Sequence, residues 1–264
     1  MASPLAHEAP EKKRLRPKKL IEKALRRTPP LYRLASRIYH RMNGSFRTLS
    51  PGAPGAIERA FELIKERGQD GDYYEFGVFR GYTFLSAQQT CNRLGLNETR
   101  FWGFDSFQGL PRVEGVDEGE GEFFEGQFAC GKDEVIGNLS SHGFDWSRAE
   151  LIEGFYSDSL TEELKRDRPF RPAAVVVLDC DLYSSTQEAL AWIKDLLAPT
   201  AVLLFDDWHS YGGATDRGQP LAFQEFLEAH PEFQAEEGWE FANNGKTFVV
   251  RRVPALLDPP PPRG

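Results

Sequence analysis

Three aspartates lie directly after two apolar runs of the sequence, where their carboxylates could hold a metal ion. Asp179 follows the run 174–178, and Asp206 and Asp207 follow the run 201–205. Carboxylates at the carboxyl ends of neighbouring buried strands lie in the crevice where open α/β sheets bind ligands. Their convergence there is costly unless a cation neutralises them, and hard oxygen ligands of this kind suit Mg²⁺. The pattern therefore predicts a magnesium site formed by Asp179, Asp206 and Asp207.

Two residues near these strand ends could act as a general base. His209 follows Asp207 by two positions, and an imidazole titrates near neutral pH. A lone histidine could equally be a metal ligand or an ordinary surface residue. Asp179 is the other candidate base, and no spacing argument separates it from His209. Both are therefore candidate catalytic residues.

A glycine-bearing turn lies upstream of the aspartates, in the run YEFGVFRG at residues 74–81. Gly77 allows the backbone to turn tightly, and Gly81 allows a close approach where the next helix begins. The spacing is Gly-x-x-x-Gly, and Phe79 stands where a dinucleotide fingerprint requires glycine. Glu75 adds a carboxylate that disfavours phosphates and suits a cationic ligand. S-adenosylmethionine (SAM), with its ammonium and sulfonium groups, is such a ligand.

A further acid supports a cofactor site at this turn. Asp105 lies thirty residues after Glu75, at the end of the second expected strand. An acid at that position can accept hydrogen bonds from both hydroxyls of a ribose. The glycine spacing alone is a weak signal, because a helix cap and a structural turn produce it too. Its place between a strand and a helix, with acids at both positions, favours a SAM site.

Apolar runs alternate with helical patterns from residue 56 onward. Strands are expected at 72–76, 101–104, 149–153, 174–178, 201–205, 233–238 and 246–252. Helices are expected at 57–67, 83–94, 133–139, 158–166 (with Ser157 as N-cap), 186–197 and 220–230. This alternation predicts a doubly wound α/β fold whose sheet is mainly parallel. The closing strand pair indicates an antiparallel edge, and hence a seven-stranded, methyltransferase-like sheet. The strand order does not follow from the pattern.

The two ends of the chain differ from this central part. Residues 1–50 are strongly basic and are expected to form a helical extension broken by Pro29–Pro30. These helices would either cover the main domain or contact an acidic partner or membrane face. Residues 51–253 form the expected catalytic domain. Residues 254–264 are proline-rich and are expected to be a disordered tail.

One long segment between expected elements could close over a site. Residues 106–130 contain many glycines and acids, together with four phenylalanines. Loops of this length inside a compact domain are commonly active-site lids, which exclude water when they close. A disordered insertion is the alternative, because residues 114–122 are acidic and rich in glycine.

The overall composition excludes several classes of protein. The net charge of −8 excludes the whole chain as a nucleic-acid binder. The sequence has no apolar run of the ~20 residues that a membrane span needs, and no secretory signal is apparent. Its three cysteines form no metal-type pair and indicate a reducing compartment, so a cytoplasmic location is expected. A homo-oligomer is compatible with the sequence.

Five ordered motifs resemble those of the macrocin O-methyltransferase (TylF-type) family. They are YEFGVFRGYT, FDSFQGLP, LIEGFYSDSL, LDCDLYSST and LFDDWHSYGGA, and the resemblance runs from about residue 70 to residue 250. Members of this family are class I SAM-dependent enzymes that methylate sugar hydroxyls of macrolides with Mg²⁺. The resemblance thus implies SAM and Mg²⁺ as cofactors. The expected acceptor is a small molecule with a sugar, polyol or diol hydroxyl.

The resemblance also implies a set of site residues. The methionine part of SAM would lie on the glycine turn, the ribose at Asp105 and Ser106, and the adenine near Ser157 or Asp158. The metal would lie at the three aspartates. The implied cofactor-binding residues are Glu75, Gly77, Val78, Phe79, Gly81, Thr83, Asp105, Ser106, Ser157 and Asp158.

Four other functions remain compatible with the residues. One is a SAM methyltransferase that needs no metal, and a second is a Mg²⁺-dependent phosphoester hydrolase. The hydrolase would leave Glu75 beside the glycine turn without a role. A nicotinamide-dependent reductase is disfavoured by Phe79 at the middle glycine position. A non-catalytic binding module is the fourth.

Overall fold

The computed structural model describes residue 46, residues 50–118 and residues 123–253. Most of the predicted basic extension and the whole proline-rich tail lie outside the described residues. Among the described residues, no helix is long and apolar enough to cross a membrane.

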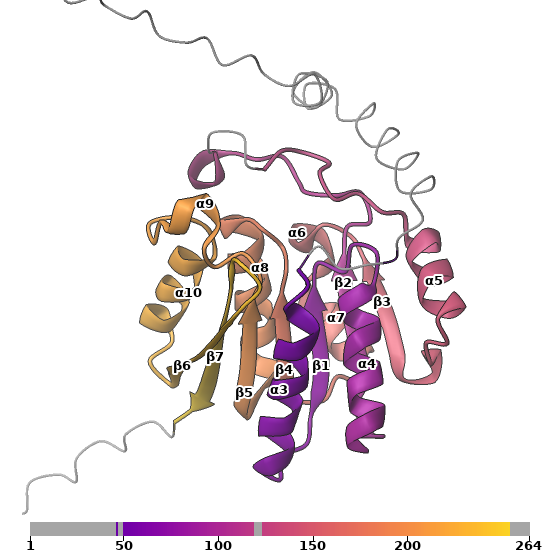
Figure 1. Cartoon of the computed structure of the whole chain (residues 1–264). Coiled ribbons are helices and arrows are strands. Elements are labelled where there is room, and N and C mark those ends of the chain that lie inside the picture. The colour runs from indigo at the N-terminus through magenta and orange to yellow at the C-terminus, as the bar shows by residue number, and fades with distance from the viewer. Residues whose placement is uncertain (1–45, 47–49, 119–122, 254–264) are drawn as a thin grey trace, which may run out of the picture.

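A seven-stranded sheet with the order β3-β2-β1-β4-β5-β7-β6 forms the centre of the protein (Figure 1). The strands are β1 (Asp72–Phe76), β2 (Phe101–Asp105), β3 (Ala149–Glu153), β4 (Ala173–Leu178), β5 (Leu197–Phe205), β6 (Phe233–Phe241) and β7 (Gly245–Arg252). The first five strands pair in parallel, and β7 pairs antiparallel with both β5 and β6. The predicted fold class, including the antiparallel edge, is therefore confirmed.

Helices cover both faces of the sheet (Figure 1). They are α3 (Ala53–Glu66), α4 (Tyr82–Leu94), α5 (Lys132–Ser141), α6 (Tyr156–Ser159), α7 (Glu162–Asp167), α8 (Tyr183–Ile193), α9 (Ser210–Gly213) and α10 (Gly218–Ala229). The part of the chain that the structure describes also contains three short 3₁₀ turns, η1 (Gly115–Asp117), η2 (Trp146–Arg148) and η3 (Lys194–Leu196).

Alternation along the central strands produces the two cores. In β1, Tyr73 packs with α3 and α4, whereas Tyr74 packs with the apolar residues of α8 and α10. In β4, Val175 and Val176 divide between the same two cores. Successive side chains of a strand point to opposite faces, so a run that is apolar throughout must be covered on both sides.

The strand order places a ligand crevice between β1 and β4. The chain runs outward from β1 through β2 to β3, and then crosses to the other side of β1 to form β4. Open α/β sheets bind ligands at such a reversal, beyond the carboxyl ends of the strands. The residues that follow β1, β2, β4 and β5 thus face one shared space.

One predicted helix is wrong. The pattern predicted a single helix at 158–166 with Ser157 as its N-cap, but two short helices, α6 and α7, occupy this region. The hydroxyl of Thr161 accepts a hydrogen bond from the backbone N of Leu164 at 3.1 Å, and so caps a new helix. Ser157 lies inside α6 instead.

Candidate active site

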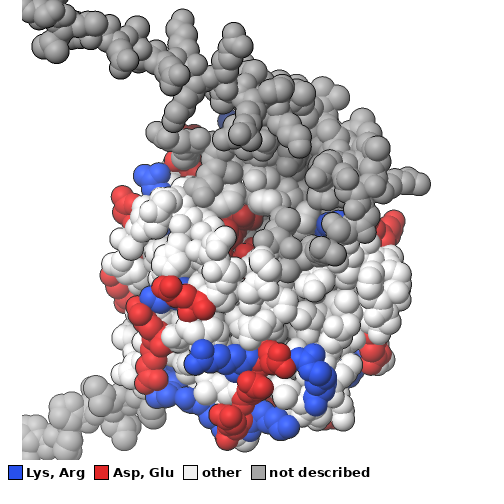
Figure 2. Space-filling view, in the orientation of Figure 1, with Lys and Arg blue, Asp and Glu red and all other residues white. Residues whose placement is uncertain are grey.

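A cavity of about 450 Å³ opens at the carboxyl ends of the parallel strands. The space-filling view shows acidic atoms inside a hollow of the surface in this part of the molecule (Figure 2). The cavity is lined by ten of the residues that the sequence singled out, namely Gly77, Val78, Phe79, Thr83, Asp105, Ser106, Ser157, Asp179, Asp206 and Asp207. The fold thus brings together the glycine turn and the aspartates.

Four predicted site residues do not line the cavity. Glu75 is completely buried beneath the glycine turn, and Gly81 lies at the N-cap of α4. Asp158 lies in α6 beside Ser157 but outside the lining. His209 also lies outside it, and its ring nitrogen is 3.3 Å from a carboxylate oxygen of Glu240. Of the two candidate bases, the structure therefore brings Asp179 alone into the cavity.

Gly77 joins the glycine turn to the first aspartate. Its φ angle of +92° is one that side chains rarely allow. A Cβ at this position would lie 1.7 Å from the backbone oxygen of Asp179. The backbone N of Asp179 donates in turn to the carbonyl of Phe76 at 2.8 Å. The absence of a side chain at Gly77 is thus a condition for the position of Asp179.

Asp105 fixes the conformation of the turn. One of its oxygens accepts hydrogen bonds from the backbone N atoms of Val78 (2.8 Å) and Phe79 (2.9 Å). The other oxygen accepts from the backbone N of Phe107 at 2.6 Å. Burial nonetheless raises the pKa of the Asp105 carboxyl, against these hydrogen bonds. The carboxylate holds the turn in the shape that the cavity wall requires.

Glu75 supports the same turn from below. Its carboxyl group accepts hydrogen bonds from the hydroxyl of Thr83, at 2.6 Å, and from the hydroxyl of Tyr73. Burial raises the pKa of Glu75 to about 8. Glu75 therefore acts on the cavity through Thr83, which lines it.

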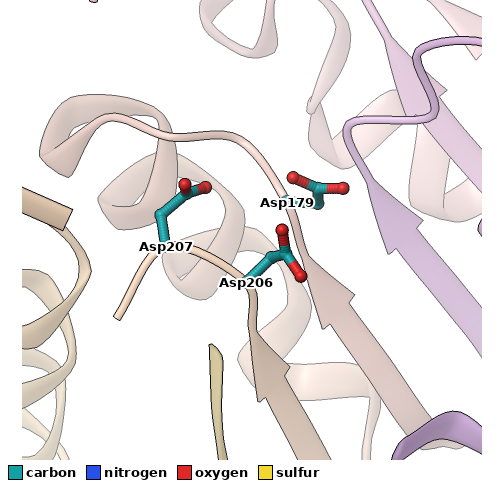
Figure 3. Close-up of side chains that lie close together, drawn as sticks. All are labelled: Asp179, Asp206 and Asp207. Atoms are coloured by element: carbon teal, nitrogen blue, oxygen red, sulfur yellow. The ribbon is translucent and has the colours of Figure 1, made fainter. Parts of the chain in front are cut away.

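The three aspartates project from the loops that follow β4 and β5 (Figure 3). Asp179, Asp206 and Asp207 each offer a carboxylate oxygen, and the three oxygens lie within 4.8 Å of one another. The parallel register continues past the strands, because the backbone N of Asp206 donates to the carbonyl of Leu178 at 3.1 Å. The hydroxyl of Ser50 donates to the carboxylate of Asp206 at 2.6 Å.

The electrostatics of this cluster fit a bound cation. Burial raises the pKa of Asp179 well above its ordinary value, and the charges of Asp206 and Asp207 raise it further. Burial also raises the pKa of Asp206, against the hydrogen bond from Ser50. No lysine or arginine of the described residues pairs with Asp179 or Asp206. Three half-buried carboxylates whose oxygens lie this close together match the donor set that Mg²⁺ prefers.

The segment predicted as a lid borders the cavity. Gly109 to Arg112 on one arm, and Gln127 with Phe128 on the other, contribute to the lining. The two arms are joined by backbone hydrogen bonds, from Leu110 N to Gln127 O and from Gly126 N to Leu110 O, both 2.9 Å long. Asp117 anchors the first arm on the N-terminus of α8. Whether the segment opens and closes stays a prediction.

Several lining residues had no clear signal in the sequence. Arg80 lies within the glycine motif, so that motif could have indicated it. Ser50 and Asn244 lie far apart in the chain and have no motif. The start of α3 packs closely against the β6–β7 turn, so that a Cβ at Gly52 would lie 2.4 Å from the backbone N of Ala242. This packing brings Ser50 and Asn244 to the same cavity.

Comparison with known proteins identifies relatives of this chain. The family model for macrocin-O-methyltransferase (TylF) matches residues 42–230. The chain is 28% identical over 181 residues to 8-demethyl-8-(2,3-dimethoxy-α-L-rhamnosyl)-tetracenomycin-C 4'-O-methyltransferase of Streptomyces olivaceus, covering 63% of this chain and 67% of that protein. It is 25% identical over 159 residues to mycinamicin III 3''-O-methyltransferase of Micromonospora griseorubida, covering 58% of this chain and 61% of that protein. The O-methyltransferase NovP has a similar structure, with a TM-score of 0.61 at 20% identity over 76% of this chain and 79% of NovP.

Proposed function

The chain belongs to the macrocin O-methyltransferase (TylF) family of SAM-dependent O-methyltransferases, and we propose that its acceptor is a sugar hydroxyl of a glycosylated natural product. Membership of this family rules out the hydrolase, reductase and binding-module alternatives. One relative is named for a rhamnosyl tetracenomycin and the other for mycinamicin III. The matches span only 67% and 61% of those two proteins. The names of these relatives therefore support the proposed class of acceptor but do not establish it for this chain.

We further propose that Mg²⁺ assists the transfer. The observation that carries this proposal is the cluster of Asp179, Asp206 and Asp207, whose oxygens lie within 4.8 Å of one another in the cavity of the glycine turn. These three carboxylates would hold the ion. When bound, Mg²⁺ supplies Lewis-acid polarisation that makes a coordinated hydroxyl more acidic. The metal-independent alternative predicts the same SAM site without this requirement.

Other residues of the cavity would bind SAM and remove the proton of the acceptor. The turn from Gly77 to Phe79, held by Asp105, and the hydroxyl of Thr83 form the wall against which the methionine part of SAM binds. SAM supplies the methyl group, which passes to the acceptor oxygen in an in-line displacement that depends on close positioning. The acceptor loses its hydroxyl proton, and we assign its removal to a carboxylate oxygen of Asp179 because His209 lies outside the cavity.

Calorimetry tests the cofactor and metal parts of this function. SAM is titrated into the wild type and Asp206→Ala, each with and without Mg²⁺, and Mg²⁺ is titrated alone. We expect both proteins to bind SAM and only the wild type to bind Mg²⁺. A wild type that binds no SAM would contradict the site assignment. Methyl transfer that persists unchanged in EDTA would favour the metal-independent alternative.

A panel of acceptors tests the substrate class. Transfer of labelled methyl from SAM is measured to a natural-product glycoside, to the matching aglycone and to a simple catechol. We expect label on the sugar of the glycoside and little on the other two. Equal or greater transfer to the aglycone or the catechol would overturn the sugar assignment and leave the SAM site intact.

A further inference from the structure

A buried glutamine lies next to the aspartate cluster. Gln219 is the second residue of α10, and its side chain has no solvent exposure. A carboxamide in the protein interior is costly unless both of its ends form hydrogen bonds. The side-chain nitrogen of Gln219 donates to the carbonyl oxygen of Leu178 at 2.9 Å. The side-chain oxygen accepts from the backbone N of Asp207, also at 2.9 Å.

These two partners belong to the two loops that carry the cluster. Leu178 is the last residue of β4 and directly precedes Asp179, whereas Asp207 is the second residue after β5. The last backbone bond between these loops runs from Asp206 N to Leu178 O at 3.1 Å. The next backbone N of the β5 loop, that of Asp207, donates to the side chain of Gln219 instead. Its carboxamide takes the place of the next hydrogen-bonded rung of the sheet.

Packing of α10 alone does not require a polar residue here. The other buried side chains of this helix are mostly apolar, and Phe223 and Phe226 belong to the core on this face of the sheet. An apolar side chain at residue 219 would leave the backbone N of Asp207 and one bond of the Leu178 carbonyl without these partners. The hydroxyl of Ser210 holds the carboxylate of Asp207 at 3.2 Å, but it does not reach the β4 loop.

We propose that Gln219 is a positioning residue that sets the distance between Asp179 and Asp207 for binding of a divalent cation. The inference rests on the proposed metal function of the cluster. Mg²⁺ demands near-ideal octahedral geometry at short distances, so a small displacement of one ligand loop weakens its binding. Partners that orient metal ligands typically change metal affinity by about 10-fold to 100-fold when they are replaced.

The test compares three variants. Gln219→Met keeps the length of the side chain and removes both hydrogen bonds. Gln219→Leu also removes both hydrogen bonds and adds no charge near the aspartates. Gln224→Met is the matched control, because Gln224 lies on the same helix and donates to Glu228 at the surface, 2.9 Å away. Mg²⁺ affinity is measured by calorimetry on the full chain, Mn²⁺ binding by electron paramagnetic resonance, and SAM affinity in parallel.

We expect Gln219→Met to lose about 10-fold to 100-fold in Mg²⁺ affinity, with SAM affinity within about twofold of the wild type. Gln219→Leu should lose at least as much, and Gln224→Met should match the wild type in both measurements. Wild-type Mg²⁺ affinity in either folded Gln219 variant, or an equal loss of SAM and Mg²⁺ affinity, would overturn the inference alone. A wild type that binds neither Mg²⁺ nor Mn²⁺ would overturn the proposed metal function and this inference with it. If Gln219→Met does not fold, Gln219→Leu carries the comparison.

Discussion

The two ends of the central sheet hold carboxylates in different ways. At the amino end, Asp72 is fully buried and accepts a hydrogen bond from the indole N of Trp102 at 3.0 Å. The guanidinium of Arg171 lies 3.5 Å from the same carboxylate. At the carboxyl end, Asp179 and Asp206 are drawn together without a lysine or arginine partner among the described residues. Burial alone therefore does not distinguish a site from a structural acid.

The two ends of the sheet differ in the groups that surround each acid. Burial raises the pKa of Asp72, but Trp102 and Arg171 act to lower it. Around Asp179, the charged neighbours that affect its pKa all raise it further. Like charges held together in a partly buried site repel one another, so the carboxyl end is where the proposed cation would stabilise the protein. The amino end is complete without a ligand.

The largest effect is expected at Gly77, where the glycine turn contacts the backbone of Asp179. Gly77→Val would force a side chain into the backbone of Asp179 and into a φ of +92°. We expect kcat/KM to fall by about 100-fold or more, with loss of both SAM and Mg²⁺ binding. Gly55→Val, at a position of α3 with open space around it, is the control. Loss of SAM binding with wild-type Mg²⁺ affinity would show that the turn and the aspartates are independent.

A matched pair of substitutions tests the comparison directly. Asp72→Asn places an amide nitrogen against a buried donor, so we expect a loss of about 1–3 kcal/mol in the free energy of unfolding. Asp206→Asn keeps an acceptor for Ser50 and removes one of the three charges that repel each other, so the metal-free protein should be as stable as the wild type or more stable. Urea unfolding in EDTA measures both. Destabilisation of similar size at both positions would contradict the distinction between the two ends.

The same unfolding experiment, repeated with Mg²⁺, tests the difference between these two variants further. A ligand that binds only the folded state at 100 times its Kd stabilises by about 2.7 kcal/mol. We expect this gain in the wild type and in Asp72→Asn, after correction for the lower baseline of the variant. Asp206→Asn should gain little. A gain in Asp206→Asn equal to that of the wild type would show that Mg²⁺ stabilises the protein from another place.

A smaller effect concerns the pH dependence of stability through Glu75. Burial raises its pKa from the ordinary 4.5 to about 8 in the folded state. The stability that its neutral form provides is complete below pH 4.5 and is lost as the pH rises through about 8. Glu75→Gln should therefore be less sensitive to pH in this window than the wild type, in EDTA. Parallel pH profiles of the urea midpoint would contradict the role of Glu75.

Local patterns predicted the parts of the site that follow directly from strand ends. Asp179 and Asp206 could be identified because an apolar run and the acid after it are adjacent in sequence. The same holds for Gly77, whose turn closes β1. Ser157 is not a cap, because it lies inside the short helix α6 and Thr161 caps the separate helix α7.

Contacts between distant segments were beyond such patterns. Ser50 and its partner Asp206 are 156 positions apart, and no periodicity connects them. Gln219 appears in the sequence as an ordinary polar residue near a helix start, and only the packing of α10 brings it to Leu178 and Asp207. Motifs therefore identified many of the residues that line the cavity, whereas Ser50 and Gln219, which hold the aspartate loops, required the fold.

The smallest expected effect concerns Asp117, another buried carboxylate, whose oxygens form hydrogen bonds with backbone groups. Asp117 is 3% exposed, and its two oxygens accept from the backbone N atoms of Tyr183 (2.6 Å) and Ser184 (3.1 Å) at the start of α8. Helix N-termini favour such carboxylates by about 1 kcal/mol. Asp117→Asn keeps one acceptor and loses the charge, so global stability should fall by no more than about this amount.

The consequence for function should nonetheless be measurable, because Asp117 fastens one arm of the segment that borders the cavity. We expect KM for SAM and for the acceptor to rise by a few-fold, with faster limited proteolysis within residues 106–118. Glu114→Gln, three positions earlier on the exposed side of this arm, is the control. Unchanged KM values and proteolysis rates in Asp117→Asn would show that the arm stays in place without this anchor, and that Asp117 serves only to cap α8, as Asp72 serves only the amino end of the sheet.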